Sequence, residues 1–113
     1  ETKDCKSYTL NIAFLYGGRD EIVRAVNCII KDKKESITEE EFSNYLYTAG
    51  QKDPDLIVRA SGEQRVSNFL LWQLAYSEFY FPKTLWPDFK EDDLNEAIKE
   101  YNLRERRFGG IKK

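Results

Sequence analysis

The sequence contains no histidine and no methionine, and it has only two cysteines, three prolines and a net charge of −2. Without histidine, histidine-based catalysis and most zinc sites are excluded. A net charge this small provides no overall basic field, so we expect no nucleic-acid partner and only local anion sites. We find no signal peptide and no apolar run long enough to span a membrane. The lack of an initiator methionine is expected of a processed product or a piece of a longer chain.

What the chain does contain is typical of a single folded domain over residues 1–113. Its residues are 41% hydrophobic and 34% charged, which is the balance of a globular rather than a disordered chain. The two cysteines, Cys5 and Cys28, are too few for a disulfide framework. Cys28 also lies on the apolar side of a predicted helix, so we expect a reduced, buried thiol.

Hydrophobic spacing predicts alternating strands and helices along the whole chain. We expect strands over 8–16, 55–61 and 78–81, and helices over 19–30, 38–50, 68–76 and 91–108. Thr38 followed by Glu41 is the pattern of a capping box, and Ser67 is the expected cap of the helix over 68–76. This order predicts an α/β fold, an open parallel sheet with right-handed crossovers, flanked by helices.

The stretch "RASGEQRVS", residues 59–67, follows the second predicted strand and is the strongest candidate for chemistry. Ligands of open parallel sheets bind beyond the carboxyl ends of the strands. Here Arg59, Arg65 and Ser67 would meet the free N–H groups of a helix start, an arrangement that suits a pyrophosphate. The alternative is a surface network in which both arginines pair with Glu63, and the sequence leaves the two interpretations open.

Four further features have a functional and a plain interpretation. Gly17–Gly18–Arg19 is either an anion-binding helix start or a simple turn. Glu78, at the start of a strand, is either a Mg²⁺ ligand beside the pyrophosphate site or a strand-edge acid. The acidic group of Asp92, Asp93 and Glu96 is either a metal motif or simply a favoured helix start. The basic helix end of Arg104, Arg106 and Arg107 is either a site for a partner's anion or a solvated face.

Several segments together resemble the cis-prenyltransferase family, in particular its undecaprenyl diphosphate synthases. They are "LNIAFLYGGRDEIVRAV", "LYTAG", "DPDLIVRASGEQRVSNFLLWQLAYSEFYF", "LWPDF" and "RERRFGG", which match in order from about residue 8 to residue 110. The resemblance implies a Rossmann-like homodimer that condenses isopentenyl diphosphate onto an allylic diphosphate with cis geometry, using Mg²⁺. It also implies a cytoplasmic enzyme of isoprenoid lipid-carrier synthesis, with peripheral membrane contact through the product left open.

The resemblance also assigns roles to individual positions of this sequence. The implied contacts to isopentenyl diphosphate are Arg59, Arg65, Val66 and Ser67, and the implied metal ligand is Glu78. Arg107 and Gly109 belong to a motif that, by the resemblance, reaches the substrate site across the dimer. Leu10 and Ile12 are implied to lie near the floor of a lipid tunnel. Two positions depart from the pattern. Ala60 stands where threonine is common, and Gln64 stands where some members have a histidine linked to the metal site.

The family's amino-terminal half, which carries its essential aspartate, has no counterpart in these residues. We therefore expect the carboxyl-terminal portion of a synthase, inactive alone. The rival interpretation is a non-catalytic subunit of a heteromeric enzyme, against which "RASGEQR" and Glu78 argue because a scaffold does not need them. A generic phosphate-binding α/β domain is the third interpretation.

Overall fold

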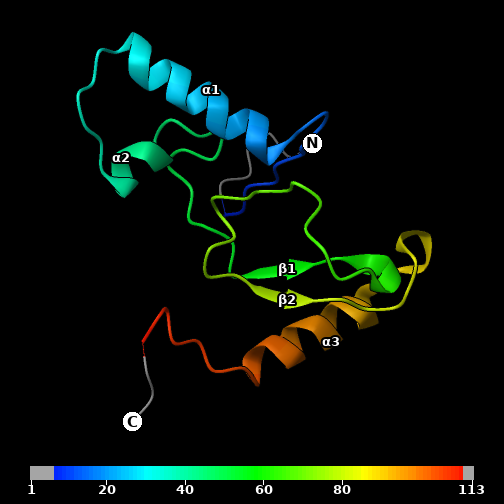
Figure 1. Cartoon of the computed structure of the whole chain (residues 1–113). Helices are drawn as coiled ribbons and strands as arrows, with labels where there is room; N and C mark the ends of the chain where they lie inside the picture. The colour runs from blue at the N-terminus through cyan, green and yellow to red at the C-terminus, as the bar shows by residue number, and fades with distance from the viewer. Residues whose placement is uncertain (1–6, 111–113) are drawn as a thin grey trace.

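The computed structural model describes residues 7–110, which form helices around a small sheet (Figure 1). Cys5 lies outside the described residues. In chain order the elements are α1 (Gly18–Lys31), α2 (Glu39–Ser43), β1 (Leu56–Val58), the 3₁₀ turn η1 (Ala60–Gly62), β2 (Glu78–Tyr80), the 3₁₀ turn η2 (Trp86–Asp88) and α3 (Glu91–Asn102). Within this described part of the chain, no helix has the length and apolar character needed to cross a bilayer.

The sheet consists of β1 and β2, which run parallel, with Leu56 opposite Glu78 and Val58 opposite Tyr80. Because side chains alternate along a strand, Glu78 and Tyr80 lie on one face and Phe79 on the other. Helix α3 lies along β2 (Figure 1), and Arg104, just after α3, contacts Glu78. The opposite face holds Ile57, Phe79 and Phe81. The predicted α/β class with parallel strands is therefore confirmed.

The strand predicted over residues 8–16 is not formed. Leu10, Ile12 and Phe14 are more than 80% exposed, and this segment joins neither strand of the sheet. Alternating apolar residues become a strand only when a sheet edge satisfies their backbone groups and a core takes one face. Leu15 also has a left-handed φ of 53°, which interrupts the extended backbone.

The helix predicted over residues 68–76 is also wrong, because this segment folds as successive turns. Ser67, Asn68 and Leu70 have positive φ values of 48°, 65° and 45°, which a right-handed helix cannot contain. The segment instead accepts hydrogen bonds from the first N–H groups of α1. The carbonyl of Asn68 accepts from the Gly18 N–H at 2.6 Å, and its Oδ1 accepts from the Arg19 N–H at 2.9 Å.

The other helices form where they are expected: α1 extends one residue beyond each predicted end, whereas α2 and α3 are shorter than predicted. Thr38 and Glu41 make the predicted capping box, but α2 ends at Ser43 and turns continue to Gly50. Helix α3 stops at Asn102 rather than at residue 108. Cys28 is a free thiol, half-buried rather than buried.

The centre of the molecule is polar as well as apolar. Among the described residues the buried apolar side chains are Ala25, Leu46, Leu74 and Ala97, whereas Glu21 and Gln73 are each only 1% exposed. Gln73 Nε2 donates to Glu21 Oε1 at 3.1 Å, and the Tyr47 N–H donates to Glu21 Oε2 at 2.7 Å. Tyr16 donates its hydroxyl to the same carboxylate. One carboxylate on α1 thus joins three separate segments.

The phenol of Tyr16 is held in its donating form. Its burial, together with the hydrogen bond to the Glu21 carboxylate, raises the pKa of Tyr16 well above its ordinary value. Ionisation would place a second negative charge against a buried one, so the hydrogen bond persists throughout the neutral range.

Replacing Gly18 with alanine should destabilise the protein by about 1–3 kcal/mol, the usual cost of overpacking. A Cβ at this buried position would lie 2.8 Å from Leu71 Cγ and 3.0 Å from the Asn68 carbonyl oxygen. Urea unfolding of the full-length protein measures the change. Gly17→Ala is the matched control, since its Cβ would meet only the movable Asn68 side-chain nitrogen at 3.0 Å. Equal losses in the two variants would contradict this packing argument.

Candidate anion-binding site

The loop that carries the two central arginines begins where β1 ends and is braced by backbone hydrogen bonds. Within η1, Ser61 and Gly62 have φ values of 80° and 71°. The N–H of Ser61 donates to the Thr84 carbonyl, and that of Gly62 donates to the Pro82 carbonyl, both at 2.8 Å. The left-handed conformation at Gly62 suits glycine, and the bonds fix the turn against the segment after β2.

The Arg59 guanidinium holds this loop together by hydrogen bonds to several of its residues. Its Nη1 donates to the carbonyl of Arg65 at 2.6 Å and to Ser67 Oγ at 2.9 Å, and its Nη2 lies 3.2 Å from Glu63 Oε2. The Arg59 side chain is 29% exposed, so its position is largely determined by the protein. The guanidinium therefore fixes the loop and keeps the Ser67 hydroxyl beside it.

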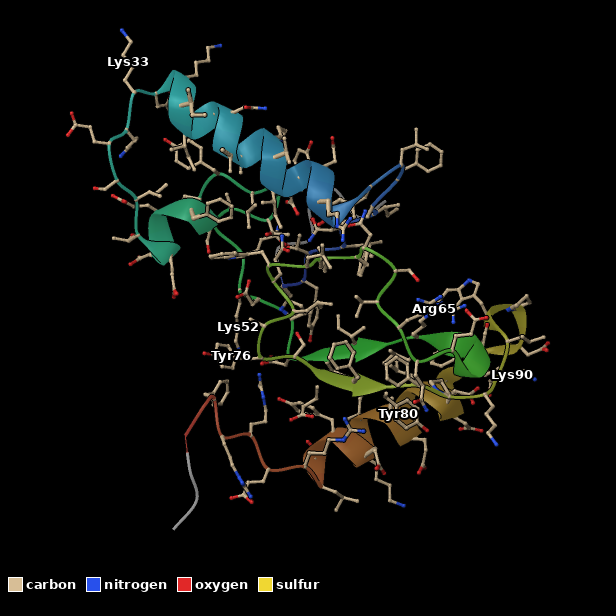
Figure 2. All side chains as sticks on the ribbon, in the orientation of Figure 1. Lys33, Lys52, Arg65, Tyr76, Tyr80 and Lys90 are labelled. Atoms are coloured by element: carbon tan, nitrogen blue, oxygen red, sulfur yellow. The ribbon has the colours of Figure 1, made fainter. Side chains whose placement is uncertain are left out.

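Arg65 has far more freedom than Arg59. Its side chain is 61% exposed, and its described ion-pair partner is the Glu63 carboxylate, which it shares with Arg59. Figure 2 shows Arg65 on the loop beyond the carboxyl end of β1, at the opposite end of the sheet from Lys52 and Tyr76. The structure thus brings Arg59, Arg65 and Ser67 together, and it also forms the network with Glu63 that the sequence left as the alternative.

A cavity of about 460 Å³ opens beside these residues. Arg59, Arg65 and Val66 contribute to its lining, and the aromatic residues of its wall are Phe69, Phe79, Phe81 and Trp86. Phe79 and Phe81 stack with their ring centroids 5.8 Å apart. The cavity therefore combines fixed positive charge with an apolar wall, which suits an anion joined to a hydrocarbon.

Glu78 does not join this cluster. Glu78 lies opposite Leu56, which comes three residues before Arg59 on the neighbouring strand. Glu78 is therefore roughly 10 Å from Arg59 along the sheet, and its side chain lies on the other face. Its Oε2 lies 3.3 Å from Arg104 Nη1. Among residues 7–110 no group of three or more Cys, Asp or Glu side chains could hold a metal. The described residues alone thus form no metal site, and the implied role of Glu78 as a metal ligand stays a prediction.

The plain interpretations hold for the other glycine and acidic motifs. The N–H groups of Gly18 and Arg19 are taken by Asn68, so Gly17–Gly18–Arg19 is a turn closed by protein. Asp93 accepts from the Lys90 N–H at 2.9 Å and from Thr84 Oγ1 at 3.1 Å, which is the role of an acid at a helix start. Asp92 and Glu96 are exposed.

The arginines after α3 divide into two kinds. Arg104 and Arg106 turn inward, to Glu78 and Asp55 respectively, so they form neither a solvated face nor an open anion site. Arg107 is 56% exposed, with Glu105 Oε2 at 3.8 Å. Gly109 is exposed, and no atom lies within 4 Å of the Cβ position at that residue. The structure does not place Arg107 and Gly109 in the cavity beside Arg59.

A second cavity, of about 550 Å³, lies along residues 11–17. Ile12 contributes to its lining, as do Glu21 and Phe69, whereas Leu10 does not. Ile12, one of the two residues implied for the lipid tunnel, thus lines a cavity to which Phe69, in the segment after Ser67, also contributes.

Sequence reasoning missed Glu21 and Asn68. Glu21 lies in the first turn of α1, where an acid is favoured for its charge alone, yet it shares a helix face with Gly18 and Ala25, the other buried residues of α1. That spacing is the signal that could have identified it. Asn68 had no such signal, because its role depends on a contact fifty residues back in the chain.

Comparisons with known proteins agree with one another. The sequence model of the family described as "Putative undecaprenyl diphosphate synthase" matches residues 1–109. The chain is 64% identical over 112 residues to the isoprenyl transferase of Fusobacterium nucleatum, covering 99% of this chain and 48% of that protein. It is 58% identical to the isoprenyl transferase of Thermotoga maritima, covering 98% of this chain and 49% of that protein.

Two solved structures are similar as well. One is a "probable undecaprenyl diphosphate synthase" from Campylobacter jejuni, with a TM-score of 0.80 and 40% identity over 96% of this chain and 50% of that one. The other is lavandulyl diphosphate synthase from Lavandula x intermedia in complex with dimethylallyl diphosphate, with a TM-score of 0.77 and 45% identity over 83% of this chain and 43% of that one. The chain thus spans about half the length of the relatives it matches.

Proposed function

Because this chain belongs to the undecaprenyl diphosphate synthase family of prenyltransferases, we propose that it forms the carboxyl-terminal, diphosphate-binding portion of a cis-prenyltransferase. In the reaction proposed for the full-length protein, the allylic C–O bond breaks and its diphosphate leaves, the isopentenyl double bond forms a C–C bond to the allylic carbon, and a proton is lost. The chain is thereby lengthened by one isoprene unit. The observation that carries the proposal is the cluster of Arg59, Arg65 and Ser67, whose two arginines line a cavity with an aromatic wall.

The two arginines have different parts in binding the diphosphate of isopentenyl diphosphate. Arg59 is fixed by the loop and offers a constant positive charge at its base. Arg65, which is more exposed, exchanges its contact with Glu63 for phosphate oxygens. Ser67 Oγ accepts from Arg59, which leaves its O–H free to donate to the same anion. Guanidinium groups suit this task because they bind phosphate oxygens in a bidentate manner.

The apolar wall would hold the hydrocarbon of the substrate. A head group fixed by Arg59 and Arg65 leaves the isopentenyl unit against Phe79 and Phe81. Fixing both ends of a small substrate orients its double bond and can supply several kcal/mol of the barrier reduction, on the order of 7 in well-oriented cases. The same wall excludes water from the cation-like allylic carbon that the reaction develops.

The cofactor and the assembly are proposals for the full-length protein. A Mg²⁺ requirement and a homodimer with cytoplasmic location follow from the family resemblance, with Glu78 as the metal ligand. Within residues 7–110 the Glu78 carboxylate lies beside Arg104 and belongs to no group of three or more Cys, Asp or Glu side chains that could hold a metal, so no chemical step is assigned to a metal.

Replacing Arg65 with alanine should raise the KM for isopentenyl diphosphate about 10- to 100-fold, with a smaller change in kcat, because one charge-assisted contact worth about 1.5–3 kcal/mol is lost. Steady-state kinetics of the full-length protein measure both constants. Lys34→Ala is the control, since it removes a cation at the far end of α1, next to Lys33 (Figure 2). An unchanged KM in Arg65→Ala would refute the assigned role.

A further inference from the structure

The residues that follow α3, here called the C-terminal arm (residues 103–110), form no helix or strand. The arm contains Arg107 and Gly109, the two residues that the family resemblance associates with the substrate site. Arg107 is 56% exposed, and open space surrounds the Cβ position at Gly109. Arg104 holds the start of the arm through Glu78, so the part around Arg107 must be held by a further residue.

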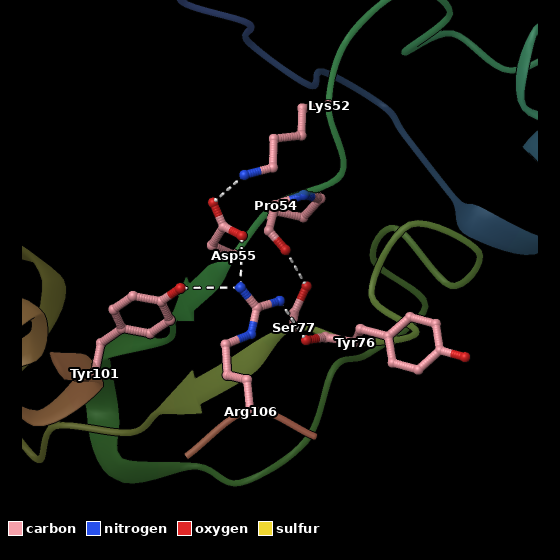
Figure 3. Close-up of polar contacts among 7 residues, drawn as sticks. All are labelled: Lys52, Pro54, Asp55, Tyr76, Ser77, Tyr101 and Arg106. Atoms are coloured by element: carbon pink, nitrogen blue, oxygen red, sulfur yellow. Dashed lines mark hydrogen bonds and ion pairs between the residues drawn. The ribbon is translucent and has the colours of Figure 1, made fainter. Parts of the chain in front are cut away.

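Arg106 is placed to do this. Its Nη1 donates to Asp55 Oδ1 at 2.7 Å and to the Tyr101 hydroxyl at 2.9 Å, and its Nη2 donates to the Tyr76 carbonyl at 2.8 Å (Figure 3). These partners lie just before β1, just before β2 and in the last turn of α3. One guanidinium, only 19% exposed, thus joins the arm to both strands of the sheet and to α3.

The surroundings of Arg106 favour this contact further. The guanidinium lies over the ring of Phe108 at 4.5 Å, and that ring packs against Tyr76 with a centroid distance of 5.7 Å. The hydrogen bond from Arg106, with a second from Lys52, lowers the pKa of Asp55 below its ordinary value. Asp55 is therefore ionised at neutral pH, and the pair is charged on both sides.

We propose that Arg106 is a positioning residue that anchors the C-terminal arm and so determines where Arg107 is presented. This inference rests on the proposed function for the role of Arg107, whereas the anchoring itself rests on the contacts of Arg106. Neighbouring side chains of an extended segment point to opposite sides. With Arg106 turned inward and held by three partners, Arg107 projects outward from a fixed base.

Two measurements on the full-length protein test the proposal. The first is amide hydrogen exchange of residues 103–110 in the wild type, Arg106→Gln and Asp55→Asn. We expect exchange in the arm to rise about tenfold or more in Arg106→Gln, as expected for a segment that loses its tertiary contacts, and to rise less in Asp55→Asn, where two of the three partners remain. Lys99→Gln, which removes an exposed cation from α3, is the matched control and should leave the arm unchanged.

The second measurement is a double-mutant cycle on kcat/KM between Arg106→Gln and Arg107→Ala. If Arg106 acts through Arg107, the double variant should lose no more activity than Arg107→Ala alone. If the two residues act independently, the fold-losses in kcat/KM of the two single variants should multiply in the double variant. Multiplying losses, or unchanged exchange in the arm of Arg106→Gln, would overturn the inference. An inactive wild type would refute the proposed function instead, and the exchange measurement would still decide the anchoring.

Discussion

Glu21→Ala should be the most destabilising single substitution in the described part of the chain, with an expected loss of about 3 kcal/mol or more. The Glu21 carboxylate is buried and accepts hydrogen bonds from the Tyr16 hydroxyl, Gln73 Nε2 and the Tyr47 N–H. Each buried donor left without a partner costs about 1–3 kcal/mol. Of these three, Gln73 Nε2 keeps a second acceptor, Thr48 Oγ1 at 3.1 Å, which limits its share of the loss.

Two variants separate the hydrogen-bond network from simple charge. Glu21→Gln keeps one acceptor for the Tyr47 N–H. Its amide nitrogen would replace the oxygen that accepts from Gln73 Nε2, so the Gln73 amide must turn over to offer its Oε1, a buried atom with no hydrogen-bond partner among the described residues. We expect the cost of Glu21→Gln to be about 1 kcal/mol, that of one ordinary hydrogen bond. Asp20→Ala, an exposed acid of the same helical turn, should change the stability by less than about 0.5 kcal/mol. Urea unfolding measures all three, and a small loss for Glu21→Ala would contradict the network.

The parts of the fold that the sequence predicted are those determined locally. Helix α1 has an apolar face, acids in its first turn and a lysine in its last, and it forms within two residues of the expected bounds. The capping box of Thr38 and Glu41 needs only four consecutive residues, and it forms as expected. The apolar, partly β-branched run of β1 and the aromatic run of β2 likewise pair in parallel.

The failures occur where distant residues decide the conformation. The alternation of Leu10, Ile12 and Phe14 indicates a strand, but no sheet edge within the described residues pairs with it. The segment after Ser67 has good helix formers, yet Asn68 closes the start of α1 and requires left-handed backbone at positions 67, 68 and 70. Tertiary contacts of this kind override local propensity, and no window of sequence contains them.

The same distinction applies to the candidate site. Arg59, Arg65 and Ser67 lie within nine residues of one another, so the turn after β1 was enough to predict that they meet. Glu78 belongs to another strand, and its place depended on the register. With Leu56 opposite Glu78, the acid lies at the amino end of the sheet and Arg59 at the carboxyl end, which the sequence could not establish.

Arg59→Lys should reduce kcat/KM about 100- to 1,000-fold in the full-length protein, although the substitution keeps the positive charge. The Arg59 guanidinium bonds the Arg65 carbonyl, Ser67 Oγ and Glu63 at once. A single ammonium cannot match that geometry, and losing two charge-assisted contacts costs about 3–4 kcal/mol, or two to three powers of ten. The loop would lose its inner support and Ser67 its fixed position.

The matched comparison is Arg65→Lys at the exposed end of the same cluster. Its described ion-pair partner is Glu63, and a lysine can supply a positive charge there, so we expect a loss of about tenfold or less, equal to 1.4 kcal/mol. If both arginines only contributed charge, the two lysine variants would lose activity equally, and Arg59 would have no organising role. A much larger loss at position 59, with the urea midpoint lowered in that variant alone, would show that the half-buried Arg59 guanidinium fixes the site that the exposed Arg65 uses.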